Sequence, residues 1–382
     1  MVIILRQFCI FRRNIIYLRN MEKIYRIAGH SIRVSLDSPW TFKALTPAQE
    51  DLVEKLRRGE DIGIIPVPAD RTEGLAVNEE LMGKEQMTKE IWNTFSDSEK
   101  DAFRHSLDFE QYAPFEVEGG EPLFSLRVHS GVPEELEASR GEWKMVTAVD
   151  EILPFYYGYR HNGNTIYEFF PAKGLRAGYF VMSADYSKGD YYPCERIGAR
   201  TTLMQINTSL MIQFTFATAA LDTILLHASV TRLEGKAQLF FGVSGTGKST
   251  HSRLWHEFVP ESDLMNDDNP VIRFIDGKAI VFGSPWSGKT LCYRNVSAPV
   301  RALVRLEQAP ENKIVRLETL SAYASVIAAV STIRWDHSVM DKIIPTVERA
   351  AMTVPCFQLS CRPDEEAVRV CREAVMSVEQ KS

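Results

Sequence analysis

The sequence predicts a mixed α/β protein in which a β-rich region over residues 21–200 precedes an α/β region over residues 201–382. The first region consists mostly of short runs with strand-like patterning, separated by Gly, Asn, Pro and charged residues, which is typical of antiparallel strands. Examples are EPLFSLRV, WKMVTAV, LPFYYGYR, NTIYEFFPA and AGYFVMSA. The second region contains an apolar strand-like run, a glycine-rich stretch and a helix-like run in direct succession, which indicates an α/β domain.

The beginning of the chain predicts an extension rather than a secretory signal. The first 20 residues carry four arginines and no acidic residue, and the arginines interrupt each apolar run before it reaches signal length. We therefore expect an N-terminal extension over residues 1–20 and a strand-like start at Met21. Further along, Ser96 and Glu99 have capping-box spacing, and we expect two short helices between Asn78 and Leu107.

Composition narrows the classes of protein that are possible. Lys and Arg total 44 against 50 Asp and Glu, a net charge of −6, so no global attraction to nucleic acid or an anionic membrane is expected. The six cysteines form no C-x-x-C pair, which argues against a disulfide framework and for a reducing cytoplasmic location.

Residues 201–221 form a run of 21 uncharged positions. The run includes Gln205, Asn207, Gln213 and five threonines, and unpaired polar groups are costly in hydrocarbon. We therefore predict a buried helix of a soluble domain and no membrane association. Two strands should follow, over residues 223–231 and 237–241.

The residues Gly242 to Ser249 satisfy the pattern G-x-x-x-x-G-K-[ST], between the apolar strand AQLFF and a short helix stopped by Pro260. Backbone N–H groups of such a loop converge on phosphate oxygens, Lys248 reaches the β- and γ-phosphates, and the Ser249 hydroxyl holds Mg²⁺. The residues expected to bind the nucleotide are Gly242, Ser244, Gly245, Thr246, Gly247, Lys248, Ser249 and Thr250. We call residues 242–249 the P-loop.

The same pattern recurs at residues 283–290, GSPWSGKT, which we call the second loop. Pro285 lacks an N–H donor, Trp286 crowds the loop, and the following LCYRNVSAP has no helical periodicity. We therefore expect a loop near the site rather than a second phosphate cradle. In one interpretation Lys289 reaches the transferred phosphoryl group or the acceptor, and in the other it lies in a surface turn.

Two adjacent carboxylates, Asp267 and Asp268, end an apolar stretch 19 residues after Lys248, as a Walker B metal position would. One could hold Mg²⁺ while the other accepts a proton from an attacking hydroxyl. Without the P-loop upstream, the same residues would suggest an Asx turn. His227 ends the run LDTILL, on a strand that should pair beside the one that leads into the P-loop.

The stretch HASVTRLEGKAQLFFGVSGTGKSTHS, followed by MNDDN, resembles the nucleotide-binding core of ATP-dependent phosphoenolpyruvate carboxykinase. It also resembles the catalytic domain of HPr kinase/phosphorylase, and the YRIAG and PWSGK segments are similar to those of bacterial HPr-kinase-like proteins. The resemblance covers about residues 223–310. It implies a carboxykinase/HPr-kinase-type P-loop domain with a mixed, twisted sheet. The implied roles are phosphate and Mg²⁺ binding for Lys248 and Ser249, metal binding for Asp268, general base for Asp267, and a place beside the metal or acceptor for His227.

We therefore expect an ATP- and Mg²⁺-dependent phosphotransferase, a kinase-like enzyme that moves the γ-phosphoryl group to a hydroxyl of an unknown protein or small molecule. One alternative is a nucleotide-binding switch or accessory module with little or no catalysis. Another is carboxykinase activity, which is disfavoured because no stretch matches that enzyme's oxaloacetate site. The sequence also allows a homo-oligomer, with nucleotide and acceptor as the expected partners and no nucleic acid.

Overall fold

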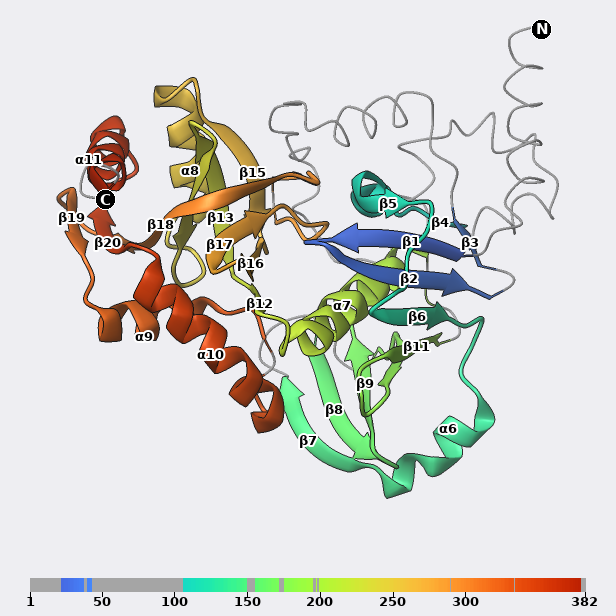
Figure 1. Ribbon diagram of the computed structural model, residues 1–382. Coiled ribbons are helices and arrows are strands. Elements are labelled where there is room, and N and C mark those ends of the chain that lie inside the picture. Colours follow the sequence, from blue (N-terminus) through green and yellow to red (C-terminus); the bar gives the residue numbers. More distant parts are fainter. Residues whose placement is uncertain are drawn as a thin grey trace, which may run out of the picture. The chain divides into compact units, whose positions relative to one another are not determined.

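The computed structural model describes residues 22–37, 40–42, 106–149, 155–171, 175–194, 197, 199–288, 290–332 and 334–378. Its fold is mixed α/β, with two large mixed sheets and helices (Figure 1). The predicted extension over residues 1–20 and Lys289 lie outside the described residues, as does nearly all of the segment predicted to form two helices. At the end of that segment, Ser106 and Leu107 are not helical; they form strand β4 (Ser106–Leu107), paired in parallel with β3 (Thr41–Phe42).

The chain divides into two compact units, of which one holds most of the residues up to Phe214 and the other the residues from Thr215 onward, together with Ile27–Gly29. Among the described residues of the first unit, nine strands form a sheet in the order β5-β1-β2-β6-β11-β10-β9-β8-β7. They are β1 (Glu22–Ile27), β2 (His30–Leu36), β5 (Glu116–Val117), β6 (Phe124–Val128), β7 (Lys144–Val149), β8 (Phe155–His161), β9 (Asn164–Phe170), β10 (Gly178–Met182) and β11 (Lys188–Pro193).

The pairing within this sheet differs in part from the antiparallel pattern that the sequence predicts. Strands β7 to β11 form an antiparallel meander, but β6 pairs in parallel with both β2 and β11. Parallel neighbours require a long connection, which local alternation of residues cannot reveal. Among the described residues of this unit, three short helices accompany the sheet: η2 (Glu110–Phe115), α6 (Glu134–Ala138) and η3 (Ser139–Glu142).

The uncharged run at 201–221 forms α7 (Ala199–Thr218), and its amides are used within the first unit. Asn207 accepts hydrogen bonds from Gln111 Nε2 at 2.6 Å and from Tyr112 Oη at 2.7 Å. Gln213 Nε2 donates to the main-chain oxygens of Ser125 and Tyr186. These polar contacts explain why the uncharged run contains amide side chains. Across the described part of the chain, no helix combines the length and the apolar character needed to span a membrane.

Nine further strands form the sheet of the second unit, counted over its described residues. They are β12 (Thr223–Leu225), β13 (Ala228–Leu233), β14 (Lys236–Phe241), β15 (Asp263–Asp268), β16 (Val271–Ile275), β17 (Lys278–Phe282), β18 (Ser297–Gln308), β19 (Lys313–Arg316) and β20 (Cys356–Cys361). The main order is β12-β16-β17-β18-β14-β13-β15, and β20 pairs with β18 and β19. Parallel pairs β14–β18 and β18–β20 form its centre, whereas β13 runs antiparallel to β14 and β15.

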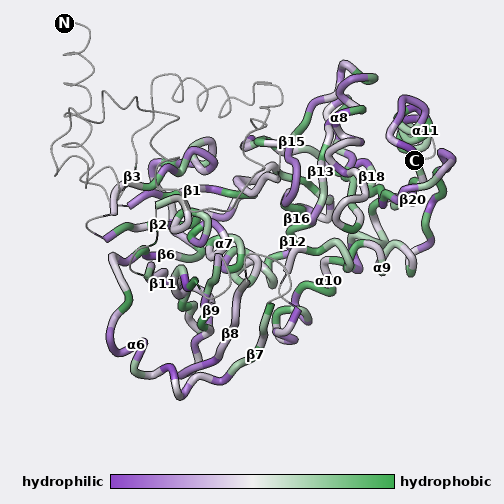
Figure 2. The backbone as a smooth tube through the Cα atoms, turned by 180° about the vertical axis from the view of Figure 1, so that it is seen from behind, coloured by the Kyte–Doolittle hydropathy of each residue, from purple (hydrophilic) through white to green (hydrophobic). Residues whose placement is uncertain are grey.

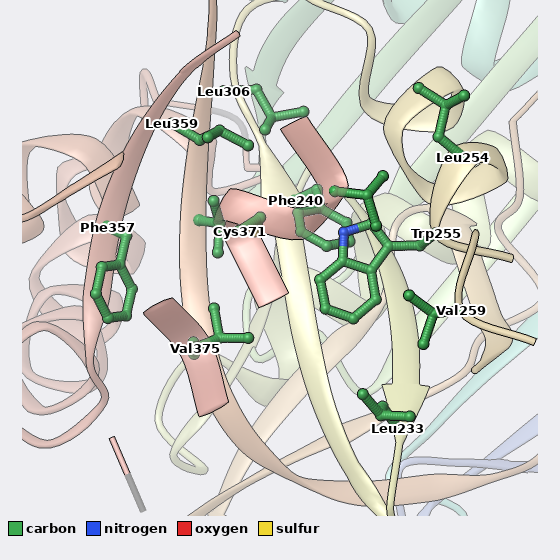
Figure 3. Close-up of a cluster of buried hydrophobic side chains, with 13 residues drawn as sticks. Leu233, Phe240, Leu254, Trp255, Val259, Leu306, Phe357, Leu359, Cys371 and Val375 are labelled. Atoms are coloured by element: carbon green, nitrogen blue, oxygen red, sulfur yellow. The ribbon is translucent and has the colours of Figure 1, made fainter. Parts of the chain in front are cut away.

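Two helices pack on one face of this sheet, α8 (Lys248–Phe258) and α11 (Glu365–Met376). Figure 3 shows Trp255 of α8, Phe240 of β14 and Cys371 of α11 in one buried apolar cluster. Trp255 is fully buried, with its ring centroid 5.6 Å from that of Phe240. Along α11, hydrophilic and hydrophobic residues are mixed, as expected of a helix with one buried side (Figure 2). Two other helices, α9 (Thr319–Ala329) and α10 (His337–Thr353), contact each other.

A buried carboxylate organises one face of the first sheet. Glu168 of β9 is fully buried, and its carboxylate lies 2.6 Å from Arg176 Nε and 2.9 Å from Arg140 Nη2. The Tyr159 hydroxyl donates to the same carboxylate at 3.1 Å. A buried carboxylate is stable only when charges and donors of this kind surround it.

We predict that Glu168→Gln lowers the free energy of unfolding by about 2 kcal/mol, the range of a hydrogen bond to a charged group. The loss should stay below that of a fully buried broken ion pair, because Arg140 and Arg176 keep 45% and 29% of their side chains exposed to water. Urea denaturation measures the change. Glu135→Gln, on the exposed side of α6, is the control, and an equal loss in both variants contradicts the prediction.

Candidate functional site

The register of three strands brings the sequence motifs to one end of the second sheet. Ala228 of β13 lies opposite Phe241 of β14 on one side and opposite Asp268 of β15 on the other. The residue before Ala228 is His227, and the residue after Phe241 is Gly242, the first of the P-loop. His227, the P-loop and Asp268 therefore lie at the same edge, although up to 41 residues separate them along the chain.

The P-loop connects β14 to α8 as a strand–loop–helix unit. Gly247 caps the helix in the left-handed region, with φ 100°, and no described side chain caps this helix end. The first N–H groups of a helix have no partner within it, and they carry its partial positive charge. At Gly242, a Cβ atom would lie 2.9 Å from the Leu306 oxygen and 2.9 Å from Thr246 Oγ1, so only glycine fits. The unit has the local geometry of an anion-binding helix start.

Lys248, the first residue of α8, is 9% exposed. Its ammonium group donates to the main-chain oxygens of Gly242 at 3.2 Å and Val243 at 3.4 Å. Burial lowers the pKa of Lys248, while the nearby carboxylates of Asp268 and Asp267 act in the opposite direction. The lysine of the P-loop is thus electrostatically coupled to both aspartates.

The two aspartates have different surroundings. Asp268 is partly exposed; His227 Nε2 lies 3.3 Å from its Oδ1, and Asn269 Nδ2 donates to its Oδ2 at 2.7 Å. Asp267 is 3% exposed, and its Oδ2 is buried with no hydrogen-bond donor among the described residues. A buried carboxylate oxygen without a donor is costly, so Asp267 has an acceptor that a ligand could satisfy.

The second loop lies against these aspartates and is built differently from the P-loop. The N–H of Gly288 donates to the Asp267 oxygen at 2.5 Å, that of Trp286 to Ser284 Oγ, and that of Gly283 to the Val296 oxygen. Asn266 of β15 holds the same loop through Ser284. Three of its N–H groups are therefore engaged within the protein, and the described residues directly after it, 290–296, are not helical. In both respects the second loop differs from the P-loop.

A pocket of about 140 Å³ lies between α8, the end of β15 and the second loop. Its wall consists of Ser249, Thr250, Ser252, Arg253, Leu264, Asp267 and Thr290. Three of these are predicted site residues: Ser249, Thr250 and Asp267. The pocket joins the P-loop helix, one aspartate and the second loop in one space.

The oxygens here suit a Mg²⁺ ion bound together with a nucleotide. Serine hydroxyl and carboxylate oxygens are the ligands that Mg²⁺ prefers, and it commonly takes only one or two carboxylates plus phosphate oxygens. Ser249 and Asp268 would supply such ligands, and the unpartnered oxygen of Asp267 belongs to the residue directly before Asp268. The described residues hold no group of three or more His, Cys, Asp or Glu side chains that would bind a metal without phosphate.

Several residues of this region were not singled out by sequence reasoning. Ser252 Oγ donates to Ser229 Oγ at 2.6 Å and joins α8 to β13. Arg253 borders the pocket four residues after Ser249, a spacing that places both on one face of a helix and was a usable signal. His251, by contrast, is indicated by the sequence as a helix-face residue, and it lies buried in α8. Burial lowers its pKa to about 4, and its Nε2 accepts from Trp255 Nε1.

Comparisons with known proteins add little to this geometry. No family model matches the sequence, and no curated protein matches it. Among solved structures, the chain is similar to the HPr(Ser) kinase/phosphatase from Coxiella burnetii, with a TM-score of 0.25 and 12% identity over 41% of this chain and 95% of that chain. At these values the likeness defines neither the family nor the activity of this protein.

At the other end of β15, Asp263 forms a charged anchor. Its carboxylate accepts from Arg232 at 2.8 and 3.0 Å and from Arg294 Nη1 at 2.6 Å, and Arg294 is 1% exposed. Arg294 also donates to the Leu264 oxygen, and Cys292 Sγ lies 3.6 Å from that oxygen. Residues 287, 288 and 290–294 therefore lie along the edge of β15 that β13 leaves open. Burial raises the pKa of Asp263, but the hydrogen bonds and charges of Arg232 and Arg294 outweigh it and leave the pKa below 3.8.

We predict that Asp263→Asn lowers the free energy of unfolding at pH 7 by about 3–5 kcal/mol, because it leaves the buried Arg294 charge uncompensated. The folded-state pKa is depressed, so this stabilisation is present above the pKa of an unfolded aspartate and is lost as the pH falls through the folded pKa. The difference between wild type and variant should therefore shrink in acid. Denaturant unfolding at several pH values, with the exposed Asp341→Asn as control, measures it; a pH-independent difference argues against the ion pair.

Proposed function

We propose that this protein is an ATP- and Mg²⁺-dependent phosphotransferase that moves a γ-phosphoryl group to a hydroxyl of a protein or a small molecule. The observation that carries the proposal is the convergence at one sheet edge of the P-loop helix start, Lys248, and a buried carboxylate that lacks a donor. A module that only binds nucleotide has no need of that carboxylate.

In the proposed reaction, the P-loop N–H groups and Lys248 bind the β- and γ-phosphates. Ser249 and Asp268 would hold Mg²⁺, which when bound offsets the phosphate charge. Asp267 accepts the proton of the acceptor hydroxyl as its oxygen bonds to the γ-phosphorus. The bond from that phosphorus to the β–γ bridging oxygen breaks, and ADP leaves with the electron pair. His227, 3.3 Å from Asp268, would keep that carboxylate oriented.

The acceptor side of the site is proposed to include the second loop. Its Gly288 N–H and Ser287 hydroxyl hold the Asp267 main chain, and Thr290 borders the pocket. Lys289 lies between these residues in the sequence, so its proposed part is to approach the transferred phosphoryl group or the acceptor. Incubation with γ-labelled ATP, Mg²⁺ and a lysate of the source organism would reveal the acceptor.

Lys248→Ala should weaken MgATP binding about 10- to 100-fold, since it removes a charge-assisted hydrogen bond to the phosphates. It should also abolish any labelling of an acceptor. Isothermal titration calorimetry with MgATP gives the affinity. Lys278→Ala, at an exposed position of β17, should bind as wild type does. An unchanged affinity of Lys248→Ala for MgATP would contradict the proposal that the P-loop binds the phosphates.

Asp267→Asn should keep MgATP affinity within a few-fold and reduce transfer about 100- to 10,000-fold, the usual effect of losing a general base. Asp276→Asn, in the exposed turn between β16 and β17, is the matched control. Product formation is followed as labelled acceptor or as ADP released. Equal ADP release in wild type and Asp267→Asn, with no acceptor labelled, would instead favour a nucleotide-binding switch.

A further inference from the structure

Arg253 is a charged residue of the pocket that the proposed reaction does not use. It lies on α8, four residues after Ser249, which is about 6 Å further along the helix axis. Side chains on a helix lean toward its N-terminus, so a guanidinium at this position covers the turn that contains Ser249 and Thr250. We therefore expect the Arg253 guanidinium to face the space beside the N-terminus of α8 rather than the P-loop itself.

The charges around this space are not paired with each other. Arg253 is exposed, its guanidinium makes no salt bridge or hydrogen bond within the described part of the chain, and Asp267 is among the residues of the same pocket wall. Asp267 is 3% exposed, with an oxygen that no described donor reaches. One positive and one negative group thus border the same pocket without forming an ion pair. A molecule with both a proton to give and a negative charge would satisfy both.

The size of the space limits what can occupy it. The pocket measures about 140 Å³, well below the roughly 300–1,000 Å³ of pockets that enclose a whole drug-sized ligand. It suits a hydroxyl-bearing fragment rather than a nucleotide. Thr290 of the second loop is also among the residues of the pocket wall.

We propose that Arg253 binds an anionic group of the acceptor, so that the acceptor is a hydroxyl compound with a carboxylate or phosphate close to the reacting oxygen. Arginine is suited to this because its planar donor fork matches both anions in bidentate geometry. The identification of the bound molecule as an acceptor rests on the proposed phosphotransfer. The anion site itself does not depend on catalysis. The anion belongs to a small hydroxy acid or phosphate ester, or to an acidic peptide segment that contains serine.

The test is binding, measured by calorimetry on the full chain saturated with Mg²⁺ and the non-hydrolysable nucleotide AMP-PNP. The small-molecule arm compares glycerate and glycerol 2-phosphate with neutral glycerol. The peptide arm compares acetyl-Ser-Asp-amide with acetyl-Ser-Asn-amide. In at least one arm the anion should bind roughly 10- to 100-fold more tightly than its neutral counterpart. The arm that shows the preference identifies the source of the anion.

The variants decide whether Arg253 is responsible. Arg253→Gln should remove the preference, Arg253→Lys should keep part of it, and both should bind AMP-PNP as wild type does. Arg372→Gln, at an exposed position of α11, should change nothing. The proposal is overturned if no anionic probe binds wild type, if anionic and neutral probes bind equally, or if Arg253→Gln keeps the preference. Anion binding that depends on Arg253 without any transfer would leave this site standing and refute the phosphotransferase instead.

Discussion

Backbone hydrogen bonds hold β13 between β14 and β15, and this pairing brings His227, the start of the P-loop and the two aspartates to one sheet edge. Ala228 faces Phe241 on one side and Asp268 on the other, so a P-loop at the end of β14 must lie beside the aspartates at the end of β15. A shift of one residue would turn each side chain to the other face of the sheet. The anchors at both ends of β15, Asp263 with its two arginines and Asp267 with Gly288, oppose such a shift.

Packing behind the sheet supports the same arrangement. Trp255 fixes α8 against Phe240, in the strand that leads into the P-loop, and α11 completes the cluster (Figure 3). The Ser252–Ser229 hydrogen bond adds a polar link between α8 and β13. The N-terminus of α8 is therefore held in a fixed position relative to the ends of the strands. Binding groups held on rigid elements lose little entropy when a ligand arrives.

Local patterns in the sequence were sufficient where structure is local. An apolar run, a glycine pattern and a helix-like run predict the strand–loop–helix unit, which is present at 236–258. The uncharged run at 201–221 predicts a helix, which is present at 199–218. The pairing of Asp263 with Arg294 and the parallel pairing of β2 with β6 join residues far apart in the chain, and no short pattern encodes them. The contribution of Arg253 to the pocket was missed for a related reason. Helical spacing predicts that Arg253 lies on the same helix face as Ser249, but only the fold shows which residues lie opposite that face.

The residues on either side of Lys289, 287–288 and 290–294, affect how the protein behaves in concentrated solution. β15 is the last strand on its side of the described sheet, and the free N–H and C=O groups of such a strand can pair with another chain. Here Gly288 and Arg294 occupy the oxygens of Asp267 and Leu264 along that edge. The residues that shape the pocket therefore also shield the strand from aggregation, so a change that opens this segment would reduce solubility as well as alter the pocket.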